Sequence, residues 1–93
     1  MNLPSVESLE SAHNFPCVYT FKAIGSATEN FTARVVSHVR DELGLEADPP
    51  FSIRSTKKGD HVAITIEPTC DSAQQVLAIC SRLMGMDGLV MLL

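Results

Sequence analysis

Short segments in which apolar and polar residues alternate predict the strands of this chain. The segments 17–24 and 61–67 alternate and are rich in β-branched residues, so both are expected to be strands. The segment 51–58 alternates weakly and is polar, which is typical of an edge strand. A short apolar run at 89–93 predicts a fourth strand.

Apolar residues at intervals of three and four predict two amphipathic helices. The stripe of the first helix consists of Phe31, Val35, Val36, Val39 and Leu43. This helix is expected to end at Gly44, because glycine readily adopts the left-handed conformation that ends many helices. The stripe of the second helix consists of Ala73, Val76, Leu77, Cys80, Leu83 and Met84. Each helix has a predicted capping box, formed by Ser26 with Glu29 and by Asp71 with Gln74.

The order strand, helix, strand, strand, helix, strand predicts an α+β domain with the ferredoxin-like βαββαβ fold. Right-handed crossovers give a two-layer sandwich, in which two helices cover one face of a four-stranded antiparallel sheet. Gly59 and Asp60 predict a two-residue hairpin turn between the second and third strands. Residues 1–14 are expected to form a flexible N-terminal arm with a helical turn near residues 5–10, so the single domain spans residues 15–93.

The alternation of the central strands predicts which side chains point away from the helices. If Val62, Ile64 and Ile66 point inward, their neighbours in the strand face outward, and Tyr19, Phe21 and Ala23 form the inward set of the first strand. The outward residues form a candidate partner interface: Val18, Thr20, Lys22, Ala63, Thr65 and Val90. A face of mixed aliphatic and polar groups suits burial in a homodimer or against a protein partner.

The turn between the first strand and the first helix is a candidate site for a small anion. Gly25, Ser26 and Asn30 would present backbone N–H groups at the positive end of the helix dipole. A capped helix needs the same residues without any ligand, so both interpretations stay open.

Charge and length narrow the classes of function. The chain has 93 residues and a net charge of −4, from seven Lys and Arg against eleven Asp and Glu. Domains that bind nucleic acid usually carry a basic surface, so nucleic acid is not an expected partner. No apolar run approaches the ~18 residues of a membrane span and no signal-peptide pattern opens the chain, so we expect a cytoplasmic protein without membrane contact.

The cysteines and histidines predict no metal site and no catalytic site. The three cysteines lack CxxC spacing, and the three histidines match no zinc pattern with them. These residues are Cys17, Cys70, Cys80, His13, His38 and His61. Cys70 lies near the start of the second helix, where a helix dipole can favour a thiolate, but the sequence places no His to act with it. We therefore expect no catalytic residue, no metal and no cofactor.

Several scaffold and turn segments carry a family resemblance. They are Phe15-Pro16, residues 19–25 (Tyr-Thr-Phe-Lys-Ala-Ile-Gly), 55–59 (Ser-Thr-Lys-Lys-Gly), 63–66 (Ala-Ile-Thr-Ile), Thr69, Gln75-Val76 and 90–93 (Val-Met-Leu-Leu). With these segments the chain resembles the YbeD-like family of small bacterial proteins, a family of unknown function, over roughly residues 15–93. It departs from the family at Asp60-His61, where a nearby Tyr is typical, and in having extra residues between the first helix and the second strand.

The resemblance implies a ferredoxin-like fold similar to that of ACT domains, which are small regulatory modules that bind amino acids. It also implies a cytoplasmic protein, sometimes linked by gene neighbourhood to lipoate metabolism, and no known catalytic residues. We therefore predict a non-enzymatic regulatory or interaction module, which contacts a protein partner or a second copy of itself through its sheet face or edge. The alternative is an ACT-like sensor that binds a small anionic metabolite, an amino acid or a lipoate-related acid, at the turn after the first strand.

Overall fold

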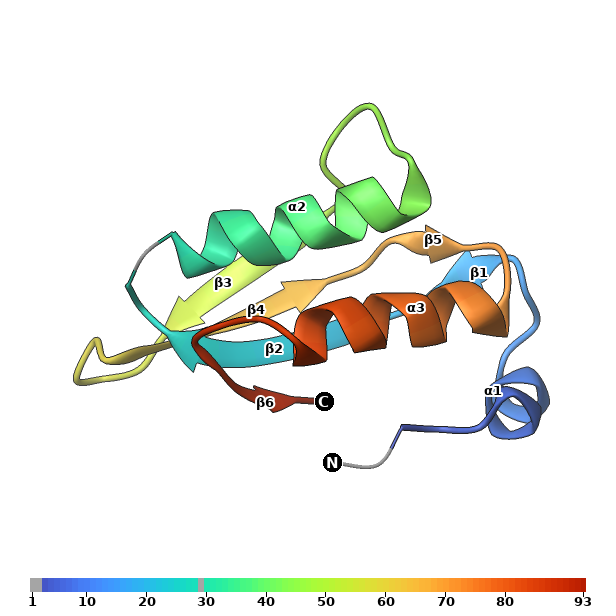
Figure 1. Cartoon of the computed structure of the whole chain (residues 1–93), viewed down its shortest axis with the longest axis horizontal. Helices are drawn as coiled ribbons and strands as arrows, with labels where there is room; N and C mark the ends of the chain where they lie inside the picture. The colour runs from blue at the N-terminus through green and yellow to red at the C-terminus, as the bar shows by residue number, and fades with distance from the viewer. Residues whose placement is uncertain (1–2, 29) are drawn as a thin grey trace.

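Two helices lie side by side on one face of a four-stranded sheet in the computed structural model, which describes residues 3–28 and 30–93 (Figure 1). The strands are β2 (Phe21–Ser26), β3 (Phe51–Ser55), β4 (His61–Ile66) and β6 (Leu89–Leu92). Their order in the sheet is β3-β4-β2-β6, and every neighbouring pair is antiparallel. The helices are α2 (Phe31–Leu43) and α3 (Ala73–Met84). This arrangement confirms the predicted ferredoxin-like fold and places β3 at an edge, as expected.

The hydrophobic core lies between the helices and the sheet. Five of the six predicted inward residues of the central strands are buried: Phe21, Ala23, Val62, Ile64 and Ile66. The sixth, Tyr19, is half-buried and packs against the core. Most of both predicted helix stripes is buried as well: Phe31, Val35, Val36, Val39, Ala73, Val76, Cys80 and Leu83. Ile79 also lies fully in the core, although the predicted stripe omitted it, whereas Met84 is exposed. Within residues 3–28 and 30–93, no helix or strand covers the remaining face of the sheet, opposite the helices, which is called here the open face.

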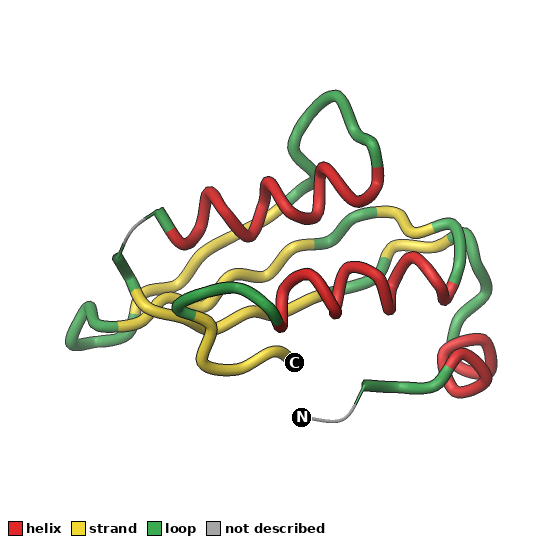
Figure 2. The backbone as a smooth tube through the Cα atoms, viewed as in Figure 1, coloured by secondary structure: helices red, strands yellow, loops and turns green. Residues whose placement is uncertain are grey.

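The first predicted strand is divided in two by a proline on the strand beside it. β1 (Cys17–Val18) pairs with β5 (Thr69–Cys70), and β2 pairs with β4 in the same register, so the four segments form one interrupted ribbon (Figure 2). The gap lies at Pro68, which has no N–H to donate to a ladder. Its carbonyl still accepts a hydrogen bond of 2.9 Å from the amide of Tyr19, which preserves the register.

Both predicted helix caps are displaced. Helix α2 begins after Asn30, which has a left-handed conformation with φ of 58° and no side-chain cap bond, whereas Ser26 ends strand β2. Asparagine tolerates that conformation better than most residues. The other half of this predicted box, Glu29, lies outside the described residues. Helix α3 is capped by Ser72, one residue after the expected Asp71, and its hydroxyl accepts from the amide of Gln75 at 3.2 Å.

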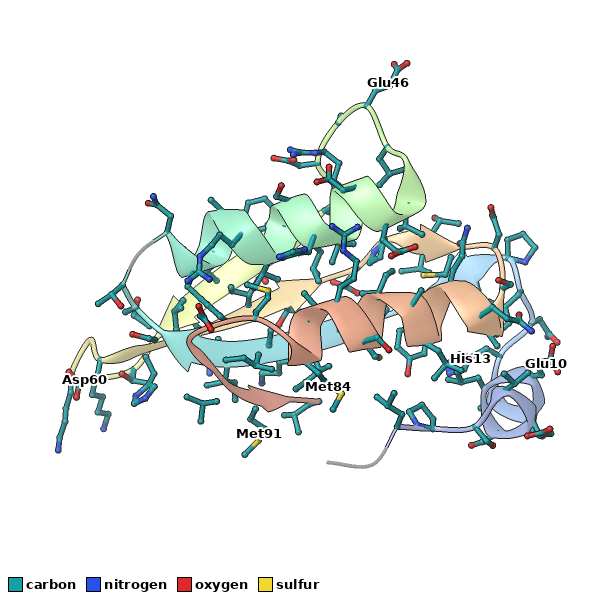
Figure 3. All side chains as sticks on the ribbon, viewed as in Figure 1. Glu10, His13, Glu46, Asp60, Met84 and Met91 are labelled. Atoms are coloured by element: carbon teal, nitrogen blue, oxygen red, sulfur yellow. The ribbon has the colours of Figure 1, made fainter. Side chains whose placement is uncertain are left out.

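The predicted two-residue hairpin turn is also wrong. The amide of Thr56 donates to the carbonyl of His61 at 3.0 Å, so the turn occupies residues 57–60. Gly59 supplies a positive φ of 74° near its end, and its amide donates to the carbonyl of Thr56 at 2.9 Å. The longer turn carries Lys57 and Lys58 beyond the sheet, and Asp60 lies close to its tip (Figure 3).

The segment expected to be an arm carries helix α1 (Val6–Ala12), which contacts α3. Ser5 caps this helix with its hydroxyl, which accepts from the amide of Ser8 at 3.0 Å. The side chain of Leu9 is only 4% exposed and belongs to the hydrophobic core. We therefore propose that this segment is part of the domain, held by one buried leucine.

Replacing Leu9 with alanine should lower the free energy of unfolding by about 2–3 kcal/mol, because it opens a cavity under α1. Leu3→Ala is a matched control, because the Leu3 side chain is exposed and its loss should cost less than about 0.5 kcal/mol. Urea unfolding of both variants measures the difference. Equal, negligible costs for the two leucines would show that residues 3–12 behave as a loose arm.

Candidate functional site

The predicted anion site lies where β2 ends and α2 begins. The amide of Ser26 donates to the carbonyl of Gly88 at 2.9 Å, and the amide of Ala27 donates to the carbonyl of Asp60 at 3.0 Å. The Ser26 and Thr28 hydroxyls lie 2.8 Å apart. Asn30 is exposed beside this turn. The Ser26 amide, which was expected to face an anion, and the neighbouring Ala27 amide are therefore already engaged with backbone carbonyls.

Gly25 has a packing role in the same turn. It is buried in β2, and a Cβ atom at this position would overlap three carbons of the Phe31 ring. The guanidinium carbon of Arg34 lies 5.7 Å from the centroid of that ring, and Arg34 Nη1 donates to the carbonyl of Asp87 at 3.0 Å. The glycine lets the first turn of α2 pack closely on the sheet.

The open face of the sheet is the second candidate site, and pairing between strands fixes which of its residues are neighbours. Thr65 of β4 lies between Lys22 of β2 and Ser52 of β3. In the next row, Ala63 of β4 lies between Ile24 of β2 and Arg54 of β3. Three of the residues predicted for the interface, Lys22, Ala63 and Thr65, are therefore adjacent on this face.

The remaining predicted interface residues lie farther along the sheet. The hydroxyl of Thr20 donates to the Glu67 carboxylate at 3.2 Å in the gap of the ribbon, and Val18 lies in β1 beyond it. Val90 is exposed at the point where β6 shifts register against β2. Thr20 and Glu67 thus lie in the row next to Lys22 and Thr65, whereas Val18 lies in the separate β1–β5 pair and Val90 lies at the register shift.

Strand β6 adds apolar side chains to the open face, and these are not among the residues predicted for the interface. Met91 pairs with Ile24, and Leu93 exchanges backbone hydrogen bonds of 2.8 and 3.2 Å with Lys22. Both are exposed, at 44% and 65%, and Met91 points away from α3 (Figure 3). The open face therefore has an apolar corner, defined by Ile24, Met91 and Leu93, beside its polar central rows.

A depression of about 310 Å³ lies among the polar rows of the open face. It is lined by Lys22, Ser52, Ile53, Arg54, Ala63 and Thr65. Lys22, Arg54, Ser52 and Thr65 thus border one small hollow, and strand alternation places their side chains on this face. Sequence alternation could have placed Arg54 on this face, but the pairing of three strands is needed to bring it near Lys22.

A larger groove, of about 780 Å³, lies on the opposite side of β3, next to α2. Phe51 and Ile53 project into it from the edge strand, and Val36 of α2 lines its other side. Arg40 at the groove is held by Asp48 at 2.9 Å and by the Ser37 hydroxyl at 3.0 Å. The groove is therefore mainly apolar, and its charged side chains are paired.

The cysteines cluster in space although they are dispersed in sequence. Cys17 and Cys70 are cross-strand partners in β1 and β5, and all three cysteines are free thiols. Burial raises the pKa of the Cys70 thiol to about 11, with smaller contributions from Cys17, Asp71 and Cys80. Cys70 is therefore a protonated, buried thiol near neutral pH rather than the thiolate that a helix dipole would favour.

The raised pKa of Cys70 predicts a loss of stability in alkali. Because the unfolded thiol has a lower pKa than the folded one, its contribution is complete below about pH 9 and is lost as pH rises toward about 11. Denaturant unfolding between pH 8 and about 11 should show this fall in wild-type protein and a shallower one in Cys70→Ala. Cys17→Ala, which keeps Cys70 buried and removes only a smaller contribution to its pKa, is the control. Identical pH profiles for Cys70→Ala and the wild type would contradict the assignment.

Residues 3–28 and 30–93 bring together no group of three or more His, Cys, Asp or Glu side chains that could hold a metal ion. Within the same residues, no helix combines the length and the apolar character needed to cross a bilayer.

Solved structures agree with the fold. The solution structure of protein HP0495 from H. pylori superposes with a TM-score of 0.69 and covers 100% of this chain and 98% of that chain. The sequence identity is 12%, so this similarity concerns the fold alone.

Sequence relatives identify the family. The UPF0250 protein of Shewanella sp. (strain ANA-3) is 31% identical over 74 residues, which cover 80% of this chain and 82% of the relative. A UPF0250 protein of Shewanella baltica is 31% identical over 75 residues, covering 81% and 83% of the two chains. The family model described as "Protein of unknown function (DUF493)" matches residues 10–93. The chain therefore belongs to the DUF493 family of small bacterial proteins, the YbeD-like family that its sequence resembles.

Proposed function

We propose that this protein is a non-enzymatic interaction module that docks a protein partner on its open sheet face. The observation that carries the proposal is the apolar corner of Ile24, Met91 and Leu93, which lies directly beside exposed polar rows. Large aliphatic side chains that cluster on an exposed face are typical of protein-interaction surfaces. The edge strand β3, whose five residues are all exposed, borders the same face.

Two further observations support a non-enzymatic role, and a third concerns the cellular compartment. The thiol with the most suitable sequence position, Cys70, is buried and has a raised pKa. The described residues hold no cluster of titratable side chains of the kind that binds a catalytic metal. The free thiols also suit a reducing compartment, which supports the cytoplasm as the place of action.

Site-specific photo-crosslinking in cells tests the proposal. A photoreactive residue at Met91 should give a discrete crosslinked product, and Leu93→Asp should remove it, because a carboxylate disrupts the apolar corner. The control position for the photoreactive residue is Gln74, which is exposed on α3 and points away from the open face. Products of the same size and yield from positions 91 and 74, or none from position 91, would refute an interaction through this face.

The sensor of a small anionic metabolite is a second candidate with less support. The amides of Ser26 and Ala27 donate to protein carbonyls, so an anion at this turn would have to compete with them. Ser26→Ala and Asn30→Gly test the site fairly, because neither should disturb the core. Thermal shifts with amino acids and lipoate-related acids should be the same in both variants and in the wild type if this turn binds nothing.

A further inference from the structure

We propose that the open face recognises acidic protein segments, and that Lys22 and Arg54 together bind a carboxylate of the partner. The inference rests on the proposed function and adds the chemistry of the partner: acidic side chains that alternate with apolar ones. The site is the depression of about 310 Å³ between the two cations.

The shape of the depression follows from side-chain length. Its floor is formed by Ala63 and Thr65 on β4, which are short. Lys22 on β2 and Arg54 on β3 lie on the two sides of β4, one row apart, and their long side chains flank this floor. The Ser52 and Thr65 hydroxyls line the same space and can donate hydrogen bonds. A carboxylate in the depression would meet an ammonium, a guanidinium and two hydroxyl donors.

The charges of the molecule favour this assignment. Arg40 pairs with Asp41 and Asp48, and Arg82 pairs with Glu42, all on the helical side. Within residues 3–28 and 30–93, by contrast, Lys22 and Arg54 make no salt bridge with an acidic side chain. The chain as a whole carries a net charge of −4, so this pair is a local positive site on an acidic protein. Carboxylates are complementary to it, and arginine can bind them with two parallel hydrogen bonds.

The apolar corner specifies what must lie beside the carboxylate. Leu93 is next to Lys22 across the β2–β6 pair, and Met91 is next to Ile24. Neighbouring strands are about 4.8 Å apart, so the apolar corner lies within the reach of a partner segment that has a carboxylate between Lys22 and Arg54. The side chains next to that carboxylate in the partner would then lie over the corner. A segment with alternating acidic and apolar residues satisfies both halves of the face.

Nucleic acid fits the same surface less well. Proteins that bind single strands usually stack bases on aromatic side chains. The central rows and the apolar corner, all within the described residues, contain Lys22, Ile24, Ser52, Arg54, Ala63, Thr65, Met91 and Leu93, and none of these is aromatic.

The test uses an end-blocked synthetic peptide of alternating glutamate and leucine, with a matched peptide that has glutamine in place of glutamate. Amide NMR titration of the full chain at low salt should shift the signals of Lys22, Ser52, Arg54, Ala63 and Thr65 with the glutamate peptide only. The double variant Lys22→Gln/Arg54→Gln should weaken the apparent affinity about tenfold, or about 1.4 kcal/mol. Added salt should weaken it in the wild type, because exposed charges are screened.

The control variant is Lys57→Gln/Lys58→Gln, which removes the same charge at the hairpin tip and should bind like the wild type. Three results would overturn the inference: no shift with the glutamate peptide, equal binding of the glutamine peptide, or unchanged affinity of Lys22→Gln/Arg54→Gln. Tighter binding of a single-stranded oligonucleotide at the same residues would assign the face to nucleic acid instead. If the peptide result fails while the Met91 crosslink persists, the interaction function stands and only its acidic specificity is lost.

Discussion

Alanine in place of Phe31 is expected to lower the free energy of unfolding by about 3–4 kcal/mol, because it removes a buried ring and leaves a cavity. The side chain is 2% exposed, contacts Gly25 of β2 and lies under the Arg34 guanidinium. For a domain of this size the midpoint of thermal unfolding should fall by about ten degrees or more. Calorimetry and urea titration both measure the change.

Phe51→Ala is the matched control for this prediction. The same chemical change at Phe51, which is 44% exposed in the groove beside α2, should cost less than about 1 kcal/mol. Equal losses at the two positions would mean that the first turn of α2 does not pack on the sheet as described. A stable Phe51→Ala variant would also be suitable for testing the groove as a binding surface without loss of the fold.

Valine in place of Gly25 should destabilise the fold by about 2–3 kcal/mol, because the new side chain has no space beside the Phe31 ring. The cost should fall below about 1 kcal/mol in a Phe31→Ala background, where the ring is absent. A double-mutant cycle of unfolding free energies measures this coupling. Additive costs would show that the clash lies elsewhere.

This coupling changes how ligand experiments at the turn are designed. A loss of metabolite binding in Gly25→Val would follow from the displaced α2 alone, so it could not identify a binding residue. Ser26 and Asn30 are the informative positions, because neither side chain is buried in the core.

The sequence predicts the architecture well because burial is periodic. Val62, Ile64 and Ile66 alternate on β4, and the stripe of α2 repeats at helical spacing. Both patterns report which side is buried without reference to any other segment. The helix termini were predicted less well, because Ser26 and Asp71 satisfy the same capping pattern as residues that cap helices. Which of several adjacent polar residues becomes the cap depends on where the neighbouring strand ends.

The candidate site depends on which residues of neighbouring strands are paired, and a single sequence does not specify that pairing. A two-residue turn at Gly59 and Asp60 would have paired Arg54 with Thr65, whereas the longer turn pairs it with Ala63. The face of Arg54 is the same in both registers, but its neighbours differ. The break after Val18 also depends on the paired strand, because its cause, Pro68, lies on that strand and not in residues 17–24.

The interruption of the long ribbon at Pro68 also divides the molecule by local stability. Beyond the gap, the distal segment has only two paired residues on each strand, so it can open with the loss of few hydrogen bonds. That segment contains Cys17 and Cys70, whereas the open-face rows lie in the longer, central pairing of β2 and β4. Local opening would therefore begin at the end with the cysteines and leave the geometry of Lys22 and Arg54 unchanged. Oxidants would then gain brief access to Cys17 and Cys70 while the central pairing of β2 and β4 stays closed.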